Sequence, residues 1–312
     1  MLIPTFDLLY HRHLFINYQV LKFMLKSKSI IILTLLMFLN FSLKAQNFEF
    51  FFEKGQENLK SGNYKIALLC FDTVIKLDPQ FANSYFNRAL VKYQLSDIKG
   101  AVNDLNNYVV LVPNDEDGYN MRGRMKKDYK DTTGAIVDFD LSLLLNPKNI
   151  DIRLLRGKLL TGINSFSKSQ EDFTYAYKLD STNDEVIYFK GVTHYYMDEL
   201  DTAIKYLSKC KEIDSTRRNK YHFISKCYYY KKDYINALKN INKSISLDPS
   251  DELSYVARAL IYIFNENKED NYLAKNDLYK AVEMGSIQAK NIIAEYYNVD
   301  VDEEEGDPNL HI

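Results

Sequence analysis

Histidines, cysteines and carboxylates at short fixed spacings are the side chains that most often signal catalysis or metal binding in a sequence. After residue 45 the chain has three histidines, His194, His222 and His311, and none has a cysteine or carboxylate at the spacing of a metal ligand. The sequence also lacks a phosphate-binding glycine loop and a nucleophile-elbow motif. It therefore predicts no catalytic centre, no cofactor and no metal site.

The three cysteines, Cys70, Cys210 and Cys227, are an odd and scattered set without CxxC spacing. We interpret them as small buried residues of helices, the usual environment of a free cysteine. A Cys210–Cys227 disulfide is the alternative, and it matters only if the chain is exported.

Composition excludes several classes of partner. The 312 residues carry 40 basic and 42 acidic side chains, so the net charge of -2 gives no electrostatic reason to expect nucleic acid or an anionic membrane surface. With 11 glycines and 6 prolines, loops should be short and the fold all-α. The 25 tyrosines and 18 phenylalanines supply bulk for a core and leave rings for surfaces.

Residues 24–45 have the pattern of a secretory signal peptide. Lys26 and Lys28 precede a short apolar run at 30–39, and Leu43-Lys44-Ala45 forms an acceptable cleavage site. The apolar run is shorter than the roughly 20 residues of a spanning helix. We therefore expect a periplasmic or secreted protein with no stable membrane span after cleavage, and a retained inner-membrane signal anchor is the alternative.

The stretch before this signal is unusually long. We expect residues 1–23 to be an upstream extension and Met24 to be the true start.

A period of 34 residues runs through the rest of the chain. From Pro79 it reaches Pro113, Pro147, Ser181, Ser215 and Pro249. Two columns hold small residues: Gly55, Ala89, Gly123, Gly157, Gly191, Ser225 and Ala259, and then Ala67, Ala101, Ala135, Ser169, Ala203 and Ala237. Two columns hold large apolar residues: Phe71, Leu105, Phe139, Phe173, Leu207 and Ile241, and then Leu77, Leu111, Leu145, Leu179, Ile213 and Leu247.

The columns predict two helices of about a dozen residues in each repeat, joined by a short turn. The Gly55 and Ala67 columns lie where the two helices cross, because only small side chains let the backbones approach. The Phe71 and Leu77 columns fill the space beside this contact. Proline ends the second helix, since it has no backbone N–H to donate.

This pattern resembles the tetratricopeptide repeat family most clearly in SGNYKIALLCFDTVIKLDP at 61–79 and KKDYINALKNINKSISLDP at 231–249. The resemblance implies a right-handed superhelical solenoid of antiparallel helix pairs whose first helices line a concave groove for peptides or proteins. It covers 48–285 as seven repeats: 48–81, 82–115, 116–149, 150–183, 184–217, 218–251 and 252–285.

Some residues depart from the pattern. Thr182 is expected to cap the next helix where Ser181 replaces proline, and Arg153, at an aromatic or aliphatic position, suggests looser packing in repeat four. In repeat seven Ala274 replaces the small residue expected at Asn271, which indicates an insertion of about three residues.

The end of the chain departs too. The segment 281–297 resembles the Sel1-like repeat class, and 286–298, with Ile287 to Tyr297 helical, is expected to be a capping helix. An acidic, disordered tail should follow at 299–312.

In the family the groove face of the first helix carries positions 2, 5, 9, 12 and 13 of the repeat. In repeats five and six these positions predict an aromatic peptide-binding groove: Tyr188, Tyr195, Tyr196, His222, Lys226, Tyr229 and Tyr230. The alternative is that these rings pack between helices. His194 and His222 fall on neighbouring first helices, so the repeat pattern allows them to approach one another.

The same positions of repeat seven are wholly apolar: Leu253, Val256, Leu260, Ile263 and Phe264. A bare apolar patch of this size is rare on a soluble monomer, so this face is a candidate interface for a second copy, or is covered by the C-terminal segment. The family's carboxylate clamp is missing, since Asn87 matches it but Phe52, Asp117 and Met121 stand at its basic positions.

Together these patterns predict a non-catalytic scaffold of the bacterial envelope that binds a protein or peptide. The alternatives are a self-associating assembly factor that uses repeat seven, and an accessory protein that binds a glycan or lipid through its tyrosines. The sequence names no partner.

Overall fold

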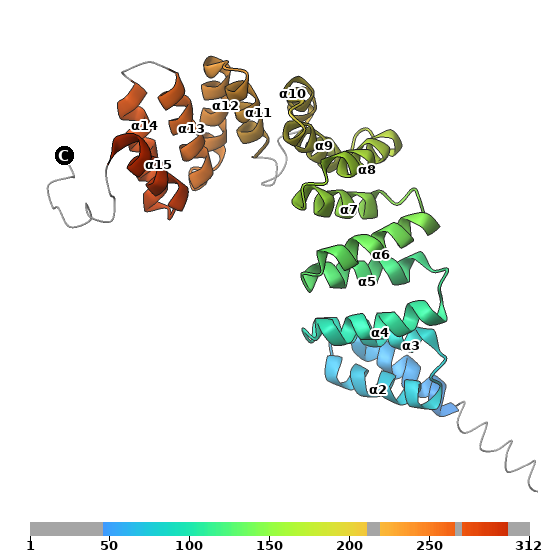
Figure 1. The fold of residues 1–312 in the computed structure, drawn as a ribbon. Helices are drawn as coiled ribbons and strands as arrows, with labels where there is room; N and C mark the ends of the chain where they lie inside the picture. Colours follow the sequence, from blue (N-terminus) through green and yellow to red (C-terminus); the bar gives the residue numbers. More distant parts are fainter. Residues whose placement is uncertain (1–45, 211–218, 266–269, 299–312) are drawn as a thin grey trace, which may run out of the picture. The chain divides into compact units, whose positions relative to one another are not determined.

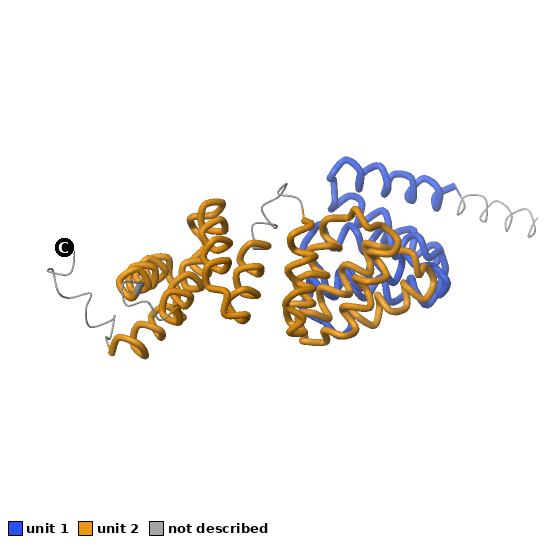
Figure 2. The backbone as a smooth tube through the Cα atoms, turned by 90° about the horizontal axis from the view of Figure 1, so that it is seen from above, with its two compact units in different colours: residues 1–135 blue, residues 136–312 orange. Residues whose placement is uncertain are grey.

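The computed structural model describes residues 46–210, 219–265 and 270–298, and these are helical, with no strand among them. The chain separates into two compact bodies, an N-terminal body up to Ala135 and a C-terminal body from Ile136 (Figure 2). Each is built from stacked antiparallel helix pairs (Figure 1). The fold is a helical repeat solenoid.

After a helical stretch at 46–60, the helices follow in pairs at the repeat period. They are α2 (Tyr64–Leu77), α3 (Ala82–Gln94), α4 (Ile98–Leu111), α5 (Glu116–Asp128), α6 (Thr132–Leu145), α7 (Ile150–Gly162), α8 (Phe166–Leu179), α9 (Asp184–Tyr196), α10 (Leu200–Lys209), α11 (Asn219–Tyr230), α12 (Tyr234–Leu247), α13 (Glu252–Phe264), α14 (Asp270–Glu283) and α15 (Ile287–Tyr297). Among the described residues no helix is both long and apolar enough to cross a membrane.

The helices of a repeat interlock through a small residue opposite a large one. All seven residues of the Gly55 column are buried, and the Phe71 column is fully buried. A Cβ atom built on Gly157 would lie 2.7 Å from the ring of Phe173. Hydroxyls mark the same close approach: Ser169 donates to the carbonyl of Gly157 at 2.9 Å and Ser225 to that of Ala237 at 2.8 Å.

The expected role of the Leu77 column is wrong. Its described members are half-buried or exposed, because they are the last residues of their helices, where the chain leaves the core. Ile213 lies outside the described residues. The buried position is three residues earlier: Val74, Tyr108, Ser142, Ala176, Cys210 and Ser244.

The turn inside each of the first six repeats uses one left-handed residue, again at intervals of 34: Gly62, Ser96, Lys130, Asn164, Asp198 and Lys232, all with φ between 59° and 77°. The next residue then begins the second helix. Asp97 and Asp233, for example, accept hydrogen bonds from the backbone N–H groups of Gly100 and Asn236.

Three local expectations concern the cap of α9, the columns of repeat seven and the closing helix. Asn183, rather than Thr182, caps α9 by accepting from the N–H groups of Glu185 and Val186. In repeat seven Ala274 and Leu278 are fully buried, three residues later than the period alone would place the two columns. α15 spans the residues expected for the closing helix.

Candidate functional site

A continuous line of aromatic rings crosses the C-terminal body. Its seven members, which we call the ring strip, lie near helix ends in α8, α9, α11, α13 and α15: Phe166, Tyr196, Tyr195, Tyr230, Tyr229, Phe264 and Tyr296. In this order the centroids of successive rings are 5.1, 5.2, 6.2, 5.4, 6.0 and 6.2 Å apart. The strip therefore joins helices of four repeats and the closing helix.

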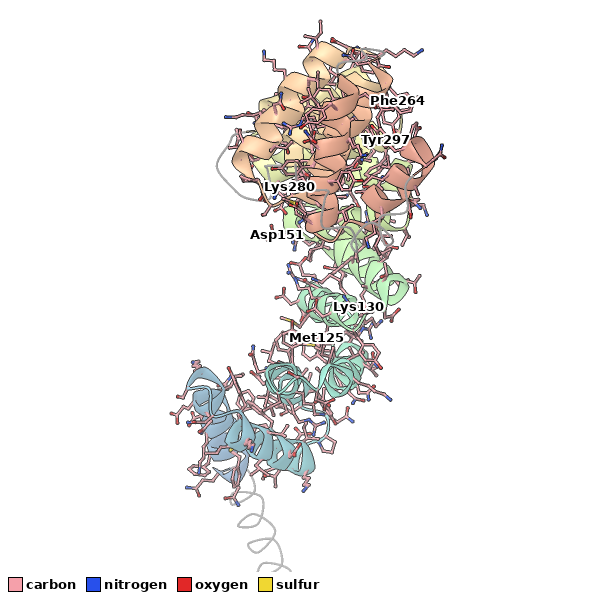
Figure 3. All side chains as sticks on the ribbon, turned by 90° about the vertical axis from the view of Figure 1, so that its left-hand side faces the viewer. Met125, Lys130, Asp151, Phe264, Lys280 and Tyr297 are labelled. Atoms are coloured by element: carbon pink, nitrogen blue, oxygen red, sulfur yellow. The ribbon has the colours of Figure 1, made fainter. Side chains whose placement is uncertain are left out.

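The ring strip is built into the core on one side and open on the other. Tyr196 is 47% exposed, Tyr230 58%, Phe264 40% (labelled in Figure 3) and Tyr296 45%. Tyr195 and Tyr229 are half-buried, and burial, followed by the neighbouring Tyr230, raises the pKa of the Tyr195 hydroxyl. Exposed rings held by buried neighbours present a large apolar area at little cost in conformational entropy.

Of the seven predicted groove residues, Tyr195, Tyr196, Tyr229 and Tyr230 belong to the ring strip. Tyr188 and His222 are buried instead: Tyr188 belongs to a hydrophobic cluster with Leu207 and Ile224, and the ring of His222 lies 6.1 Å from that of Phe223. Both are part of the core rather than of an open surface. The sequence pattern did not predict Phe166 or Tyr296 as binding residues. It placed Phe264 on the apolar face of repeat seven and not in a line of rings.

Lys226 is half-buried on α11, with its Nζ 5.9 Å from the ring centroid of Tyr195. Burial lowers the pKa of its ammonium group. One turn earlier, burial and then the charge of Lys226 lower the pKa of His222 to about 4, against a smaller opposite effect of Asp251. His222 is therefore neutral at neutral pH.

His194 has a different environment. Its Nδ1 lies 2.6 Å from a carboxylate oxygen of Glu199, its Nε2 contacts Gln170, and its ring stacks on Tyr206 at 5.4 Å. None of the described residues that interact with His194 also interacts with His222, so the two histidines do not form one site. Among the described residues no group of three histidine, cysteine or acidic side chains is placed to hold a metal ion.

The apolar face predicted on repeat seven is only partly open. Val256 is buried in one hydrophobic cluster with Ala274 and Leu278 of α14 and with Ile292 and Ile293 of α15. Leu260 and Ile263 pack against this cluster, while Leu253 and Phe264 stay exposed. Helices α14 and α15 thus cover much of the face proposed for self-association.

A ladder of arginines was missed by the sequence reading. Arg88 donates to Asp72 at 2.7 Å and to Asp104 at 2.6 Å, so it joins α2 of one repeat to α4 of the next. In the C-terminal body Arg156 and Arg258 make the equivalent bonds. The signal was available in the sequence, since arginine recurs at Arg88, Arg122 and Arg156. These bonds link neighbouring helices, and they involve no residue of the ring strip.

Arg153 in repeat four makes a bond that tyrosine makes in other repeats. Tyr85 and Tyr119 donate from their hydroxyls to the carbonyls of Pro79 and Pro113, both at 3.2 Å. At the equivalent position Arg153 donates from Nε to the carbonyl of Pro147 at 3.0 Å, and its guanidinium lies 3.8 Å from the ring centroid of Tyr175. Arginine therefore makes the same bond as tyrosine at this position, and looser packing of repeat four stays a prediction.

The three cysteines are buried as expected, and none of them is in a disulfide, so the Cys210–Cys227 bridge is not formed. Burial raises the pKa of Cys227 to about 12. The predicted signal peptide, the upstream extension at 1–23 and the acidic tail at 299–312 lie outside the described residues.

Stacked helix pairs with an exposed aromatic strip define the class of helical repeat proteins that present an extended binding surface. Three stretches, 48–81, 184–217 and 221–251, match the family model of the tetratricopeptide repeat. The first two coincide with the first and fifth repeats expected from the period.

Solved structures show the same fold. A tetratricopeptide repeat protein from Parabacteroides merdae matches with a TM-score of 0.57 and 17% identity over 80% of this chain and 97% of that one. The protein YrrB matches with 0.50 and 16% over 62% and 97%. A chain of the APC/C Cut9-Hcn1 hetero-tetramer matches with 0.53 and 15% over 77% of this chain, which spans 47% of that one. A search of the curated proteins finds no match.

Proposed function

We propose that this protein is a non-catalytic scaffold that holds a protein or peptide partner against the ring strip of its C-terminal body. The observation that carries the proposal is the strip itself, in which four of seven linked rings are at least 40% exposed. A solved structure of similar fold, YrrB, is described as a TPR protein with an unusual peptide-binding site. Tyrosine-rich surfaces of this kind are typical of the centres of protein interfaces.

The experiment is selection of displayed random peptides on the full-length chain. The bait is compared with Tyr196→Ala/Tyr230→Ala, which removes the two most exposed tyrosines of the strip. The matched control is Tyr129→Ala/Tyr272→Ala, which removes two exposed tyrosines elsewhere. Circular dichroism checks that both variants keep their helices.

We expect peptides to be enriched on the wild type and on the control, and lost from the strip variant. Enrichment that is unchanged on the strip variant would place the binding surface elsewhere. Absence of enrichment on any bait would count against peptide binding itself.

We further propose that the protein is exported to the bacterial envelope by the signal peptide at 24–45, with a retained signal anchor as the alternative. Amino-terminal sequencing of the protein from a periplasmic fraction tests this. A first residue at Gln46 supports cleavage and export, whereas recovery of the uncleaved chain in membranes supports the anchor. The likeness of 281–297 to the Sel1-like class stays a prediction.

A further inference from the structure

Lys226 differs from two other half-buried cations of the C-terminal body, Arg156 and Arg258. The guanidinium groups of Arg156 and Arg258 each donate to carboxylates, at 2.6 to 2.8 Å. No carboxylate among the described residues forms an ion pair with Lys226, and burial is the sole influence on the pKa of its ammonium. Partial removal of an ammonium group from water without an anion costs free energy, and an anion supplied by a ligand reduces that cost.

The neighbouring polar group does not supply it. His222 lies one turn before Lys226, and its buried Nδ1 has no hydrogen-bond partner. Because its pKa is lowered to about 4, His222 adds no charge at neutral pH. Asp251, which precedes α13, is the other charged group that acts on His222, and it is not paired with Lys226. The positive charge at this place therefore comes from Lys226 and not from His222.

The ring strip extends on both sides of Lys226. Tyr195 and Tyr196 of α9 lie on one side, in contact with Phe166. Tyr229 and Tyr230, on α11 itself, continue to Phe264 of α13 and from there to α15 on the other side. A ligand whose anion reaches Lys226 has rings available both before and after that anion.

We infer that the partner segment is an extended acidic-hydrophobic peptide, in which an internal Asp or Glu side chain pairs with Lys226 and large apolar residues on both sides lie against the ring strip. The inference rests on the proposed function and names the chemistry of its partner. A terminal carboxylate is disfavoured, because a chain that ends at Lys226 leaves one half of the strip uncovered. The charge-assisted bond to Lys226 fixes the register of the peptide, and the rings supply apolar contact.

Two random peptide libraries on the full-length chain test this inference. In one, each peptide is joined to its carrier through its carboxyl end, so that acidic groups come from side chains only. In the other the carboxyl end is free. The baits are the wild type, Lys226→Met, Lys226→Arg and Lys239→Met. Methionine keeps the length and apolar contact of Lys226, and Lys239→Met makes the same charge change at an exposed position of α12.

We expect the first library to yield peptides with one acidic residue between large apolar ones on the wild type, on Lys226→Arg and on Lys239→Met. The affinity of such a peptide should be about tenfold lower for Lys226→Met than for the wild type. The affinity for this variant should also depend less steeply on salt concentration. Replacing the acidic residue of the peptide by its amide should cause the same loss on the wild type and no further loss on Lys226→Met.

Four results would overturn the inference. Peptides enriched without an acidic residue would leave the proposed function standing and remove the role of Lys226. An acidic preference that survives on Lys226→Met would place the anion elsewhere. Enrichment from the free-ended library alone would assign the anion to a chain terminus. Loss of all enrichment, in both libraries, would overturn the proposed function together with the inference.

Discussion

Arg156 of α7 holds the carboxylate of Asp172 of α8 by two hydrogen bonds, from Nε at 2.8 Å and from Nη2 at 2.6 Å. The Asp172 side chain is fully buried, and Arg156 also reaches Asp140 on the preceding helix. This bidentate pair is one member of a ladder that links successive repeats. It explains how buried charges can be part of a core that is otherwise apolar.

Replacing Arg156 by methionine should lower the free energy of unfolding by about 2 to 3 kcal/mol, because Asp172 then loses its bidentate partner while remaining buried. The measurement is the urea midpoint followed by circular dichroism. Lys168→Met, at an exposed position of α8, is the control and should change stability little. Equal midpoints for the two variants would show that the ladder contributes nothing.

Substitution of Gly157 by alanine should destabilise the protein by about 1 to 3 kcal/mol, although alanine normally favours a helix, because the added Cβ meets the fully buried ring of Phe173. Gly162→Ala, where a Cβ meets nothing within 4 Å, should be neutral or stabilising. The double variant Gly157→Ala/Phe173→Leu should recover stability, because Ala89 and Leu105 occupy the same two positions in an earlier repeat and pack in one cluster. Thermal unfolding of the three variants measures these differences.

The left-handed turn position predicts two opposite effects. Lys130 (labelled in Figure 3) has φ 67°, so Lys130→Gly should stabilise the chain by up to about 1 kcal/mol. Gly62 has φ 77° with open space around it, so Gly62→Ala should destabilise by a similar amount through backbone strain alone. Urea unfolding of both variants is the test, and a change of the same sign in both would contradict it.

Stability should fall as the pH drops from about 6.5 towards 4. The pKa of His222 is near 6.5 when unfolded and about 4 when folded, so in this window the unfolded state binds a proton that the folded state does not. The cost approaches roughly 3 kcal/mol at the lower end. Urea midpoints at pH 7, 5.5 and 4.5 measure it.

His222→Phe should flatten this pH dependence. Some slope should remain, because burial also lowers the pKa of His194. An unchanged slope in the variant would show that His222 is not the group responsible.

The period of 34 residues predicts the fold well, because every repeat has the same packing problem and solves it with the same residue types. The small columns and the Phe71 column therefore locate the helix crossings, and even the three-residue shift at Ala274 is visible. The sequence is less informative about Arg153, whose tyrosine-like bond to the carbonyl of Pro147 depends on geometry and not on residue class.

The candidate site is only partly predictable for a physical reason. Whether a ring on a first helix is open or buried depends on what the next helix places against it. Phe223 contacts Tyr188 and Tyr196 edge-on at similar centroid distances, 6.4 and 6.2 Å, yet Tyr188, which packs in a cluster with helix α10, is buried while Tyr196 is exposed. Repeat position alone treats these two tyrosines alike.

The most direct test of partner binding at the ring strip is site-specific photo-crosslinking. A photoreactive benzoyl-phenylalanine is placed at Tyr230, in the middle of the strip, or at Tyr272, a still more exposed tyrosine of α14. Each protein is irradiated with a peptide selected on the wild type, and the products are mapped by mass spectrometry. Our account predicts a crosslink from position 230 and none from position 272. A peptide that crosslinks at 272 and not at 230 would contradict it.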